Sequence, residues 1–476
     1  MIQFLNMVMG LVFSLFEAVF TGLADMIVTA TPSRRRDNYN ADFIPATKAL
    51  SSKEKGFCLT GDRCISIKES FSNALVFGGS GSGKSSRVLI PSIIRMAGPS
   101  SLCIHDPSGE LFEKTSGAMK KVGYAIKVLN YANTEFSENF NPLHRVQNIS
   151  DIKKLSKLLI HTSLGAGGKD PFWNSSGEAL LSVFIRYVIF HTEKKFHTLY
   201  NVLCLINAFS GAPQKVDKLF VQAKDDDLLS EYKAFVALDQ KMLMSFVATV
   251  RTALSIFADP QVARVTSSDT IDFESFRKEK TILFINNNVN EMRYYSTLSS
   301  VFFEQFFASV MSSLPKQNDM PVFFLIDEAS SLYLNILPTA ISNIRKYNSG
   351  ILQVYQSQGQ LFDLYGVPQG RNIIANCFSK VYMSGQPLET ARELELILGK
   401  YEYVDDENNK RTRQLLTMDE IRILKESIIL CGNLQPIKAK MIPFYEQREL
   451  KKLTSLLPYQ VDQKYYEEKL EQINLG

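Results

Sequence analysis

Residues 78–85 read GGSGSGKS and fit the pattern G-x-x-x-x-G-K-[ST], which constrains the fold more than any other feature of the chain. The apolar segment NALVF (73–77) precedes this pattern, and RVLIPSII (87–94) can open a helix after it. Glycines let backbone amides turn toward phosphate oxygens, and the start of a helix adds partial positive charge. A glycine-rich turn without function is the alternative, but the pattern and both flanks occur together. We therefore predict a phosphate loop that binds ATP and Mg²⁺.

The residues of this loop have different expected roles. Lys84 should reach the β- and γ-phosphates, and Ser85 should hold Mg²⁺. The residues expected to bind the nucleotide are Gly78, Gly79, Ser80, Gly81, Ser82, Gly83, Lys84, Ser85 and Ser86.

A phosphate loop needs a carboxylate on the metal side, and the segment VFFLIDEAS (322–330) supplies two. Its apolar start is typical of a buried strand, and Asp327 and Glu328 follow directly. We expect Asp327 to act on the Mg²⁺ shell and Glu328 to polarise the attacking water. Consecutive carboxylates at a strand end favour hydrolysis over binding alone. Ordinary acidic residues at a helix N-terminus are the alternative interpretation.

Two further residues are candidates for the catalytic set. Gln356 ends the next apolar run and would lie beside the acidic pair if the two strands are neighbours, where an amide can orient water. The alternative is a polar strand cap. Arg345 lies on an expected helix between those strands, and an arginine can stabilise transition-state charge from a neighbouring subunit. Arginines are also common on helix surfaces.

Composition excludes some classes of protein. Hydrophobic residues make up 45% and charged residues 21% of the 476, which excludes wholesale disorder and a fibrous repeat. A net charge of +4 provides no argument for nucleic acid at this level, so any basic track must be local. The six cysteines are scattered without a CxxC motif, so neither a disulfide framework nor a zinc ribbon is expected. A reducing compartment is the default.

Short apolar runs recur along the chain, and they are continuous rather than alternating. This pattern is typical of strands buried on both faces of a parallel sheet. The runs are 73–77, 102–105, 124–129, 282–285, 322–326, 351–355, 381–383 and 428–430. Helical stretches lie between several of them, so the predicted class is α/β with a central, mostly parallel sheet.

The pattern changes between about 145 and 270, where apolar residues recur at helical spacing and convincing strands are absent. We therefore predict an α/β domain with an all-α insertion. The expected segments are an N-terminal helix (1–31), a linker (32–52), the ATPase domain (53–145 and 270–445), the insertion (146–269) and a helical tail (446–476).

The N-terminal segment is apolar, and SRRR follows it at 33–36. A signal peptide would carry its positive charge before the apolar core. Six of its polar residues fall within a stripe roughly 100° wide, which predicts an amphipathic helix. They are Gln3, Asn6, Ser14, Glu17, Thr21 and Asp25. A membrane anchor, a helix docked on a membrane partner and a buried soluble helix all remain open. If the helix spans a membrane, the arginines at 34–36 place the following residues in the cytoplasm.

Several motifs occur in a fixed order along the chain. They are GGSGSGKS, IHDPSGEL (104–111), NFNPL (139–143), DPFWNSSGEALL (170–181), FFLIDEAS (323–330), RKYNSGILQVYQSQGQLFDLYG (345–366) and LLTMDEIRIL (415–424). Together they resemble the type IV secretion coupling proteins, the TraG/TraD-like conjugation ATPases, from about residue 50 to 445. The phosphate loop alone is unspecific, whereas its combination with D-P-x-G-E, DPFW and QSxxQLxxxYG is specific.

The resemblance implies a RecA-like ATPase domain with an inserted all-α domain. Members of that family form hexameric rings at the cytoplasmic mouth of a secretion channel, on the bacterial cytoplasmic membrane. They receive a relaxase–DNA complex and hydrolyse ATP to export single-stranded DNA, or protein. By position, Lys84 and Ser85 match the phosphate-loop residues, Asp327 and Glu328 match the acidic pair, and Gln356 matches the glutamine of the following strand.

Arg345 matches the arginine that the family is proposed to supply in trans. The chain also departs from the family pattern, because Ser108 stands where D-P-K-G-E commonly has lysine, which removes a charged role there. Members typically begin with two transmembrane helices. This chain has room for one apolar helix, so membrane attachment is expected to depend on a partner protein.

Three functions are compatible with these features. The first is an ATP-driven motor that couples a DNA substrate to a type IV channel. The second is a coupling ATPase for protein effectors, and the third is a nucleotide-gated docking platform with little turnover. The intact Asp327-Glu328 pair argues against the third.

Overall fold

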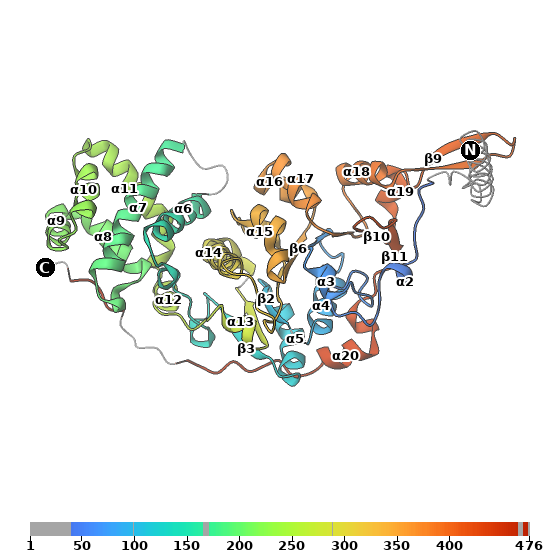
Figure 1. Cartoon of the computed structure of the whole chain (residues 1–476), viewed down its shortest axis with the longest axis horizontal. Helices are drawn as coiled ribbons and strands as arrows, with labels where there is room; N and C mark the ends of the chain where they lie inside the picture. The colour runs from blue at the N-terminus through green and yellow to red at the C-terminus, as the bar shows by residue number, and fades with distance from the viewer. Residues whose placement is uncertain (1–39, 99, 165–170, 288, 465–469, 475–476) are drawn as a thin grey trace, which may run out of the picture. The chain divides into compact units, whose positions relative to one another are not determined.

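The computed structural model describes residues 40–464 and 470–474, except Pro99, Asn288 and residues 165–170 (Figure 1). The predicted helix at 1–31 and most of the predicted linker lie outside these residues. The chain has two compact units. The larger one comprises residues 43–394 and 417–476, and the smaller one comprises residues 1–42 and 395–416.

The larger unit is built on a nine-stranded sheet with the order β11-β10-β7-β1-β6-β5-β2-β4-β3. From β7 to β3 every pairing is parallel, whereas β10 and β11 are antiparallel. The strands are β1 Ala74–Phe77, β2 Ser101–His105, β3 Ala125–Leu129, β4 Thr281–Ile285, β5 Val322–Ile326, β6 Ser349–Tyr355, β7 Ser379–Tyr382, β10 Ser427–Cys431 and β11 Ile437–Ala439. The predicted α/β class is confirmed, and each predicted apolar run forms a strand.

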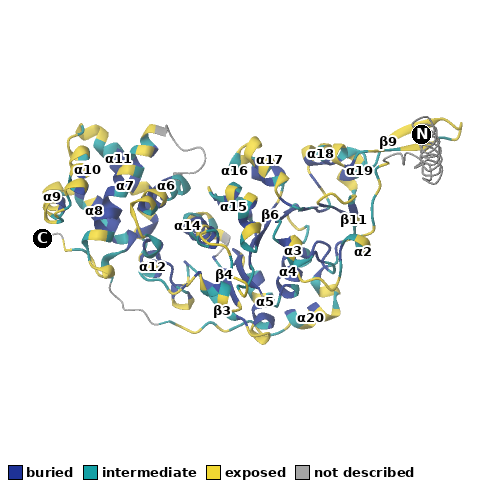
Figure 2. Cartoon of the chain, in the orientation of Figure 1, coloured by how far each residue is buried: buried dark blue, intermediate teal, exposed yellow. Residues whose placement is uncertain are grey.

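The central strands are continuous apolar runs because both faces of the sheet are covered by helices. Every residue of β1, β2, β4, β5 and β6 is buried, as the dark centre of Figure 2 shows. The helices of this part are α2 Ala46–Ala49, α3 Ile67–Ser70, α4 Ile90–Arg95, α5 Glu110–Lys121, α13 Ser275–Lys278, α14 Met292–Val310, α15 Leu337–Asn343, α16 Gln358–Tyr365, α17 Val367–Ala375, α18 Leu388–Leu398, α19 Met418–Ile423 and α20 Arg448–Thr454.

Helix α14 links the sheet to the helical insertion. Its Phe306 and Phe307 rings meet Phe324 of β5 edge-on, at centroid distances of 5.1 and 4.6 Å. The same helix contacts α6 of the insertion. Each buried phenylalanine contributes about 1.5–3 kcal/mol, so α14 is held firmly on the sheet and provides a base for the insertion.

The insertion consists of α6 Ile149–Leu164, α7 Pro171–His191, α8 Leu199–Gly211, α9 Pro213–Gln222, α10 Asp226–Val236, α11 Gln240–Leu254 and α12 Pro260–Val265. Among the described residues of 146–269 there is no strand. The stretch Gln240–Ala258, which contains α11, is long and apolar enough to cross a membrane by length and composition. It packs against α6, α7 and α8 with Phe246, Val250 and Leu254 buried, as a core helix does.

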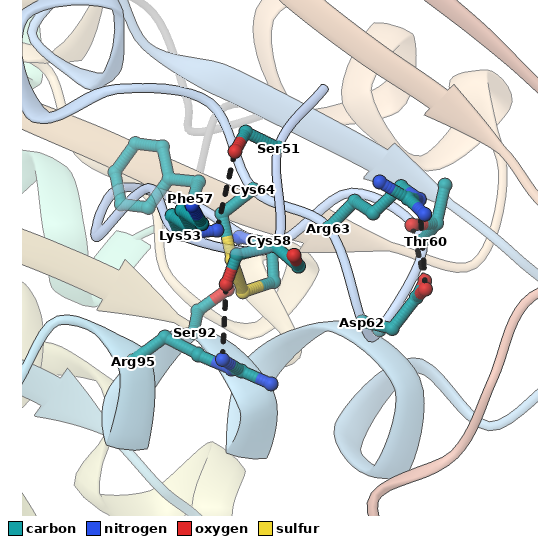
Figure 3. Close-up of a disulfide and its surroundings, with 12 residues drawn as sticks. Ser51, Lys53, Phe57, Cys58, Thr60, Asp62, Arg63, Cys64, Ser92 and Arg95 are labelled. Atoms are coloured by element: carbon teal, nitrogen blue, oxygen red, sulfur yellow. Dashed lines mark hydrogen bonds and ion pairs between the residues drawn. A yellow bond between two sulfur atoms is a disulfide. The ribbon is translucent and has the colours of Figure 1, made fainter. Parts of the chain in front are cut away.

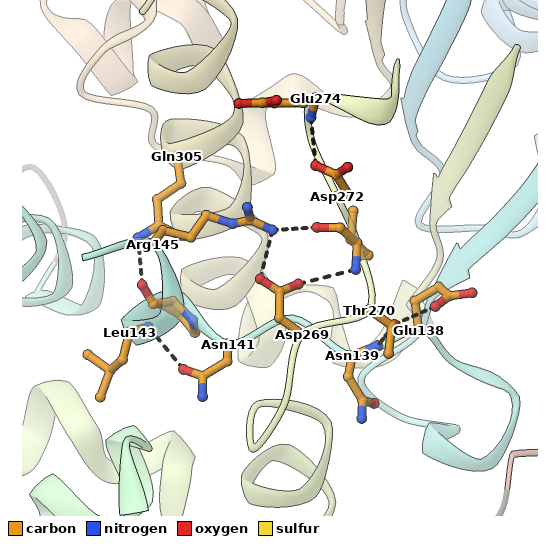
Figure 4. A network of polar contacts seen from close by, with 12 residues as sticks. Glu138, Asn139, Asn141, Leu143, Arg145, Asp269, Thr270, Asp272, Glu274 and Gln305 are labelled. Atoms are coloured by element: carbon orange, nitrogen blue, oxygen red, sulfur yellow. Dashed lines mark hydrogen bonds and ion pairs between the residues drawn. The ribbon is translucent and has the colours of Figure 1, made fainter. Parts of the chain in front are cut away.

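The chain enters and leaves the insertion through two adjacent segments, 138–145 and 266–272 (Figure 4). Backbone bonds join them, since the Thr270 amide donates to the Asn139 carbonyl at 3.0 Å. Arg145 pairs with Asp269 at 2.8 Å and lies 3.7 Å from the centre of the Phe273 ring. Burial raises the pKa of Asp269 to about 6, although Arg145 opposes the rise. We call these two segments the hinge of the insertion.

A disulfide joins Cys58 and Cys64 in the segment before β1 (Figure 3). The turn at Gly61, with φ +89°, folds the segment back so that the two cysteines face each other across an antiparallel bridge. The Cys58 amide also donates to Ser92 Oγ of α4 at 2.9 Å. The sequence did not predict this bridge. The two cysteines are six positions apart and form no CxxC motif, and only the turn between them brings them together.

The tail differs from the predicted helix over 446–476. Helix α20 covers Arg448–Thr454, and the described residues after it contain neither helix nor strand. Their backbone bonds go to other segments instead: the Tyr459 amide donates to Ser116 Oγ at 3.0 Å, and the Lys464 amide donates to the Glu135 carbonyl at 2.7 Å. The charged composition predicts a helix here, and for the described residues after α20 this prediction is wrong. Their backbone groups bond to distant segments and not to neighbouring turns of a helix.

The smaller unit contains an antiparallel hairpin, β8 Lys400–Val404 and β9 Lys410–Gln414. Most residues of both strands are exposed. An exposed hairpin lacks the apolar run that marks a buried strand, so sequence patterning did not predict it. It lies within the range 270–445 that the sequence assigns to the ATPase domain.

Arg145→Met should destabilise the larger unit by about 3 kcal/mol at pH 8, because it leaves Asp269 ionised and buried without its cation. The control is Lys154→Met. Lys154 pairs with Asp151 at 3.5 Å, but its side chain is 75% exposed, so its loss should cost under about 0.5 kcal/mol. Urea unfolding followed by circular dichroism measures both. Equal losses would mean that the hinge pair contributes no more than a surface pair.

Candidate nucleotide-binding site

The phosphate loop lies at the carboxyl end of β1, in the middle of the sheet. Gly81 and Gly83 have φ values of +73° and +80°, which residues with a Cβ rarely adopt. A Cβ placed on Gly79 or Gly81 would meet no atom within 4 Å. The loop therefore has open space along this side, as a cradle for phosphate groups requires.

Lys84 is folded back onto the loop. Its Nζ donates to the Gly78 carbonyl at 2.9 Å and to the Gly79 carbonyl at 3.2 Å, and the residue is 9% exposed. Ser85 begins the π-helical turn Ser85–Leu89 that leads into α4. The ammonium group thus lies inside the loop, bonded to neutral carbonyls that a phosphate oxygen can replace.

The acidic pair follows β5. The Asp327 amide donates to the His105 carbonyl at 3.2 Å, and His105 Nδ1 lies 2.7 Å from the Asp327 carbonyl. Burial lowers the pKa of His105 to about 4, so the ring is neutral at pH 7 and Nδ1–H donates to that carbonyl. Glu328 has φ +48°, and its amide donates to Asp327 Oδ1 at 3.0 Å. The backbone around the pair is therefore held by β2.

Burial raises the pKa of Asp327 to about 7, with a further contribution from the charge of Glu328. Lys84 opposes the rise. In the absence of a cation, a carboxylate held here is costly, because it has lost its water and lies beside another negative charge. A divalent cation would offset both effects, and this is the expected behaviour of a metal-side aspartate.

Asp106 is a third acid at this edge, and the site residues predicted from sequence do not include it. It follows β2, the neighbour of β5, and burial raises its pKa to about 6. It accepts from the Phe112 amide at 2.7 Å and from Ser108 Oγ at 3.3 Å, and so holds the start of α5. The signal that could have found it is its position directly after a buried apolar run, the same as that of Asp327.

Gln356 follows β6, which lies between β1 and β5 in the sheet. Its Nε2 donates to Glu328 Oε2 at 3.4 Å, and its own amide donates to Gln360 Oε1 at 2.9 Å. The structure therefore brings Gln356 beside the acidic pair, as expected if their strands are neighbours.

Arg345 lies elsewhere. It is exposed on the 3-10 turn Ile344–Tyr347, before the first residue of β6, and its side chain makes no ion pair with the described residues. The seven residues of β6 separate it from Gln356, a length of about 20 Å for an extended strand. Lys84, Asp327, Glu328 and Gln356 gather at one edge of the sheet, and Arg345 lies at the other.

These residues fit a nucleotide with Mg²⁺. The loop has open space beside its glycines, and no described group of three or more acidic, histidine or cysteine side chains could hold a metal alone. Mg²⁺ is commonly held by one or two protein oxygens together with phosphate oxygens. Ser85, at the start of the π-helical turn, and Asp327, directly after β5, carry oxygens of this kind.

Comparison with known proteins identifies the family. A family model described as "Type IV secretory system Conjugative DNA transfer" matches residues 33–469. The chain belongs to this family. It is 25% identical over 411 residues to protein VirD4 of Rhizobium radiobacter, covering 80% of this chain and 58% of the relative. It is 25% identical over 361 residues to a probable conjugal transfer protein TraG of Sinorhizobium fredii (strain NBRC 101917 / NGR234), covering 74% of this chain and 53% of the relative.

Solved structures of the coupling protein TrwB have the same fold as this chain. One, in complex with the GTP analogue GDPNP, has a TM-score of 0.68 at 19% identity and covers 84% of this chain and 92% of TrwB. A trigonal form of TrwBdeltaN70 with sulphate has a TM-score of 0.70 at 18% identity, covering 89% and 96%. This agreement confirms the α/β fold with its helical insertion. The chain spans less than two thirds of the length of the VirD4 and TraG relatives.

Asp327→Asn should stabilise the nucleotide-free protein, and more so at pH 8 than at pH 5. A carboxyl whose pKa is raised on folding destabilises the folded state as pH rises from its unfolded pKa, near 4, to its folded pKa, about 7. The amide carries no charge and avoids this penalty. The expected gain is larger at pH 8 by about 2 kcal/mol. Melting temperatures at both pH values, without Mg²⁺, measure it, and an equal gain at both would contradict the assigned pKa.

Proposed function

We propose that this chain is an ATPase that couples a DNA substrate to a type IV secretion channel. The observation that carries the proposal is the meeting of Lys84, Asp327, Glu328 and Gln356 at one sheet edge, in a chain of the conjugative DNA transfer family. TrwB, whose fold is similar, has been solved with ADP and Mg²⁺. The relatives named as a type IV secretion system-coupling protein VirD4 and as a probable conjugal transfer protein TraG also favour a role in type IV secretion and conjugal transfer.

In this proposal each residue acts by its position. Bound ATP supplies the phosphoryl group and the driving free energy. Lys84, now bonded to two carbonyls of its own loop, would bind phosphate oxygens, and Ser85 with Asp327 would hold Mg²⁺. Glu328 polarises water, and the amide of Gln356 beside it orients that water. Asp106 keeps α5 and the adjacent strand ends in place and so positions Asp327.

Arg345 would act on the site of another subunit. Its exposure and its place at the far end of β6 prevent it from reaching Glu328 in its own chain. A ring, expected to be a hexamer, would supply neighbours on both sides. The proposed partners are a relaxase–DNA complex, its single-stranded DNA and components of the channel, at the cytoplasmic face of the cytoplasmic membrane.

Lys84→Ala should abolish nucleotide binding, whereas Glu328→Gln should bind ATP and hydrolyse it at least about 100-fold more slowly. The difference follows from their positions, because Lys84 lies in the loop and Glu328 lies where water would be activated. Fluorescent-nucleotide titration measures binding, and phosphate release with and without single-stranded DNA measures turnover. Full turnover by Glu328→Gln would refute its assigned role.

The same assay separates the candidate functions. Turnover stimulated by single-stranded DNA supports DNA transfer. Turnover indifferent to DNA favours protein export, and binding without turnover favours a docking platform. Loss of conjugative transfer in both variants is expected, and intact transfer would overturn the proposal.

Arg345→Ala subunits mixed into wild type should lower ATPase activity by more than their fraction, because each would disable the site of a neighbour. Lys346→Ala is the matched control, since Lys346 is exposed on the same turn. Activity is measured across mixing ratios at constant total protein. A loss proportional to the variant fraction would exclude a shared role for Arg345.

A further inference from the structure

The segment after α20 contacts two different parts of the larger unit. Its first part follows α5, where a Cβ on Gly117 would lie 2.2 Å from the Leu457 carbonyl oxygen, so only glycine allows this approach. Further along, Lys464 Nζ pairs with Glu138 at 2.7 Å, at the hinge of the insertion. Residues 470–474, at the red end of the chain in Figure 1, then contact the insertion itself.

The contact with the insertion is centred on Asn201 of α8. This residue is fully buried, and its Nδ2 donates to the Glu471 carbonyl at 3.1 Å. Its Oδ1 accepts from the Ile473 amide at 3.2 Å. One side-chain amide therefore satisfies two backbone groups of the same extended segment. Because the carbonyl and the amide belong to residues two apart, Asn201 occupies the place that one residue of a parallel neighbouring strand would take.

The orientation of Asn201 is prepared by its own helix. Thr198 caps α8 and accepts from the Asn201 amide at 3.1 Å. Asn201 Nδ2 also lies 3.1 Å from the Phe196 carbonyl and 3.1 Å from Thr198 Oγ1. These acceptors define which side of the amide is nitrogen, so the oxygen faces the Ile473 amide. The orientation of the Asn201 side chain is thus fixed by residues of the insertion and does not depend on the tail.

Two flanking contacts are weaker and solvent-exposed. Lys195 Nζ pairs with Glu471 at 3.0 Å, with side chains 46% and 57% exposed. Gln472 Nε2 donates to Tyr200 OH at 2.6 Å. An exposed pair contributes little, so the two backbone bonds to Asn201 provide most of the specificity. Backbone recognition of an extended segment is a general way to bind peptides.

We infer that Asn201 is the centre of a binding site for an extended peptide backbone and that residues 470–474 of the same chain are its ligand. The described tail, 455–464 and 470–474, then acts as a strap. It is bonded to the ATPase core at Ser116 and to the insertion at Asn201, with the hinge pair Lys464–Glu138 between them. Tethering gives the ligand a high effective concentration, so few bonds suffice to keep the site filled.

The strap limits how far the insertion can move from the core while its end is bound. None of the bonds described above involves the phosphate loop or the acidic pair. Binding of the tail is therefore separate from ATP hydrolysis and can be measured without nucleotide or DNA.

The test uses the full chain with a fluorophore at its C-terminus and time-resolved anisotropy as the readout. A bound tail rotates with the protein, whereas a released tail adds a fast component. Ile473→Pro removes the N–H that Asn201 accepts and should increase the fast component strongly. Ile473→Ala keeps that N–H and is the matched control. Both variants leave the insertion unchanged, so they avoid the risk that Asn201→Ala perturbs α8.

Competition in trans tests the site directly. An acetylated peptide with the sequence of residues 470–476, added above the roughly millimolar effective concentration of the tethered tail, should displace the tail of the wild-type chain. The same peptide with proline for Ile473 should need about tenfold higher concentration, the loss expected for one hydrogen bond. A large fast component in wild type, no displacement by either peptide, or equal displacement by both would each overturn the inference.

Discussion

Strand β6 pairs in parallel with β1 on one side and with β5 on the other. Because parallel strands end at the same edge, this pairing puts the phosphate loop, Gln356 and the acidic pair beside one another. The neighbour of β5 on its other side is β2, which adds Asp106 to the same edge. The candidate site is therefore a consequence of sheet order: Asp106, Asp327, Glu328 and Gln356 lie one or two residues beyond a buried strand, and Lys84 lies at the end of the loop that follows β1.

That placement has an electrostatic cost. Burial raises the pKa of both Asp327 and Asp106, and Lys84 fills its hydrogen bonds with carbonyls of its own loop. A site with two buried acids and an ammonium held close by is arranged for ligands that bring a cation and phosphate oxygens together. The apolar packing of the surrounding strands offsets the unfavourable free energy of these few buried charged groups at the strand ends.

The helical insertion is attached to the sheet in three ways. Helix α14 packs on β5 through its phenylalanine rings, the hinge is joined by Arg145 and Asp269, and the tail reaches α8 through Asn201. The first contact is apolar and extensive, whereas the other two consist of a few polar bonds. Motion of the insertion would therefore break the polar contacts before the apolar one.

Much of this protein could be predicted from its sequence, because a buried parallel strand or a phosphate loop is formed by residues that are consecutive in the chain. The eight apolar runs, the loop at 78–85 and the pair Asp327-Glu328 belong to this class. The hairpin β8–β9, strand β11, the Cys58–Cys64 bridge and the extended tail do not, since their partners are distant or their strands exposed. Gln356 could be named from sequence, but its contact with Glu328 depended on the order of strands. The sequence by itself determined the buried strands, the loop pattern at 78–85 and the consecutive acids Asp327 and Glu328, since each is a run of consecutive residues; their roles toward phosphate and metal stay predictions. Only the tertiary structure decided that Asp106 joins Asp327, that Arg345 lies at the far edge and that Asn201 holds the tail, because long-range packing alone sets which strands and segments meet.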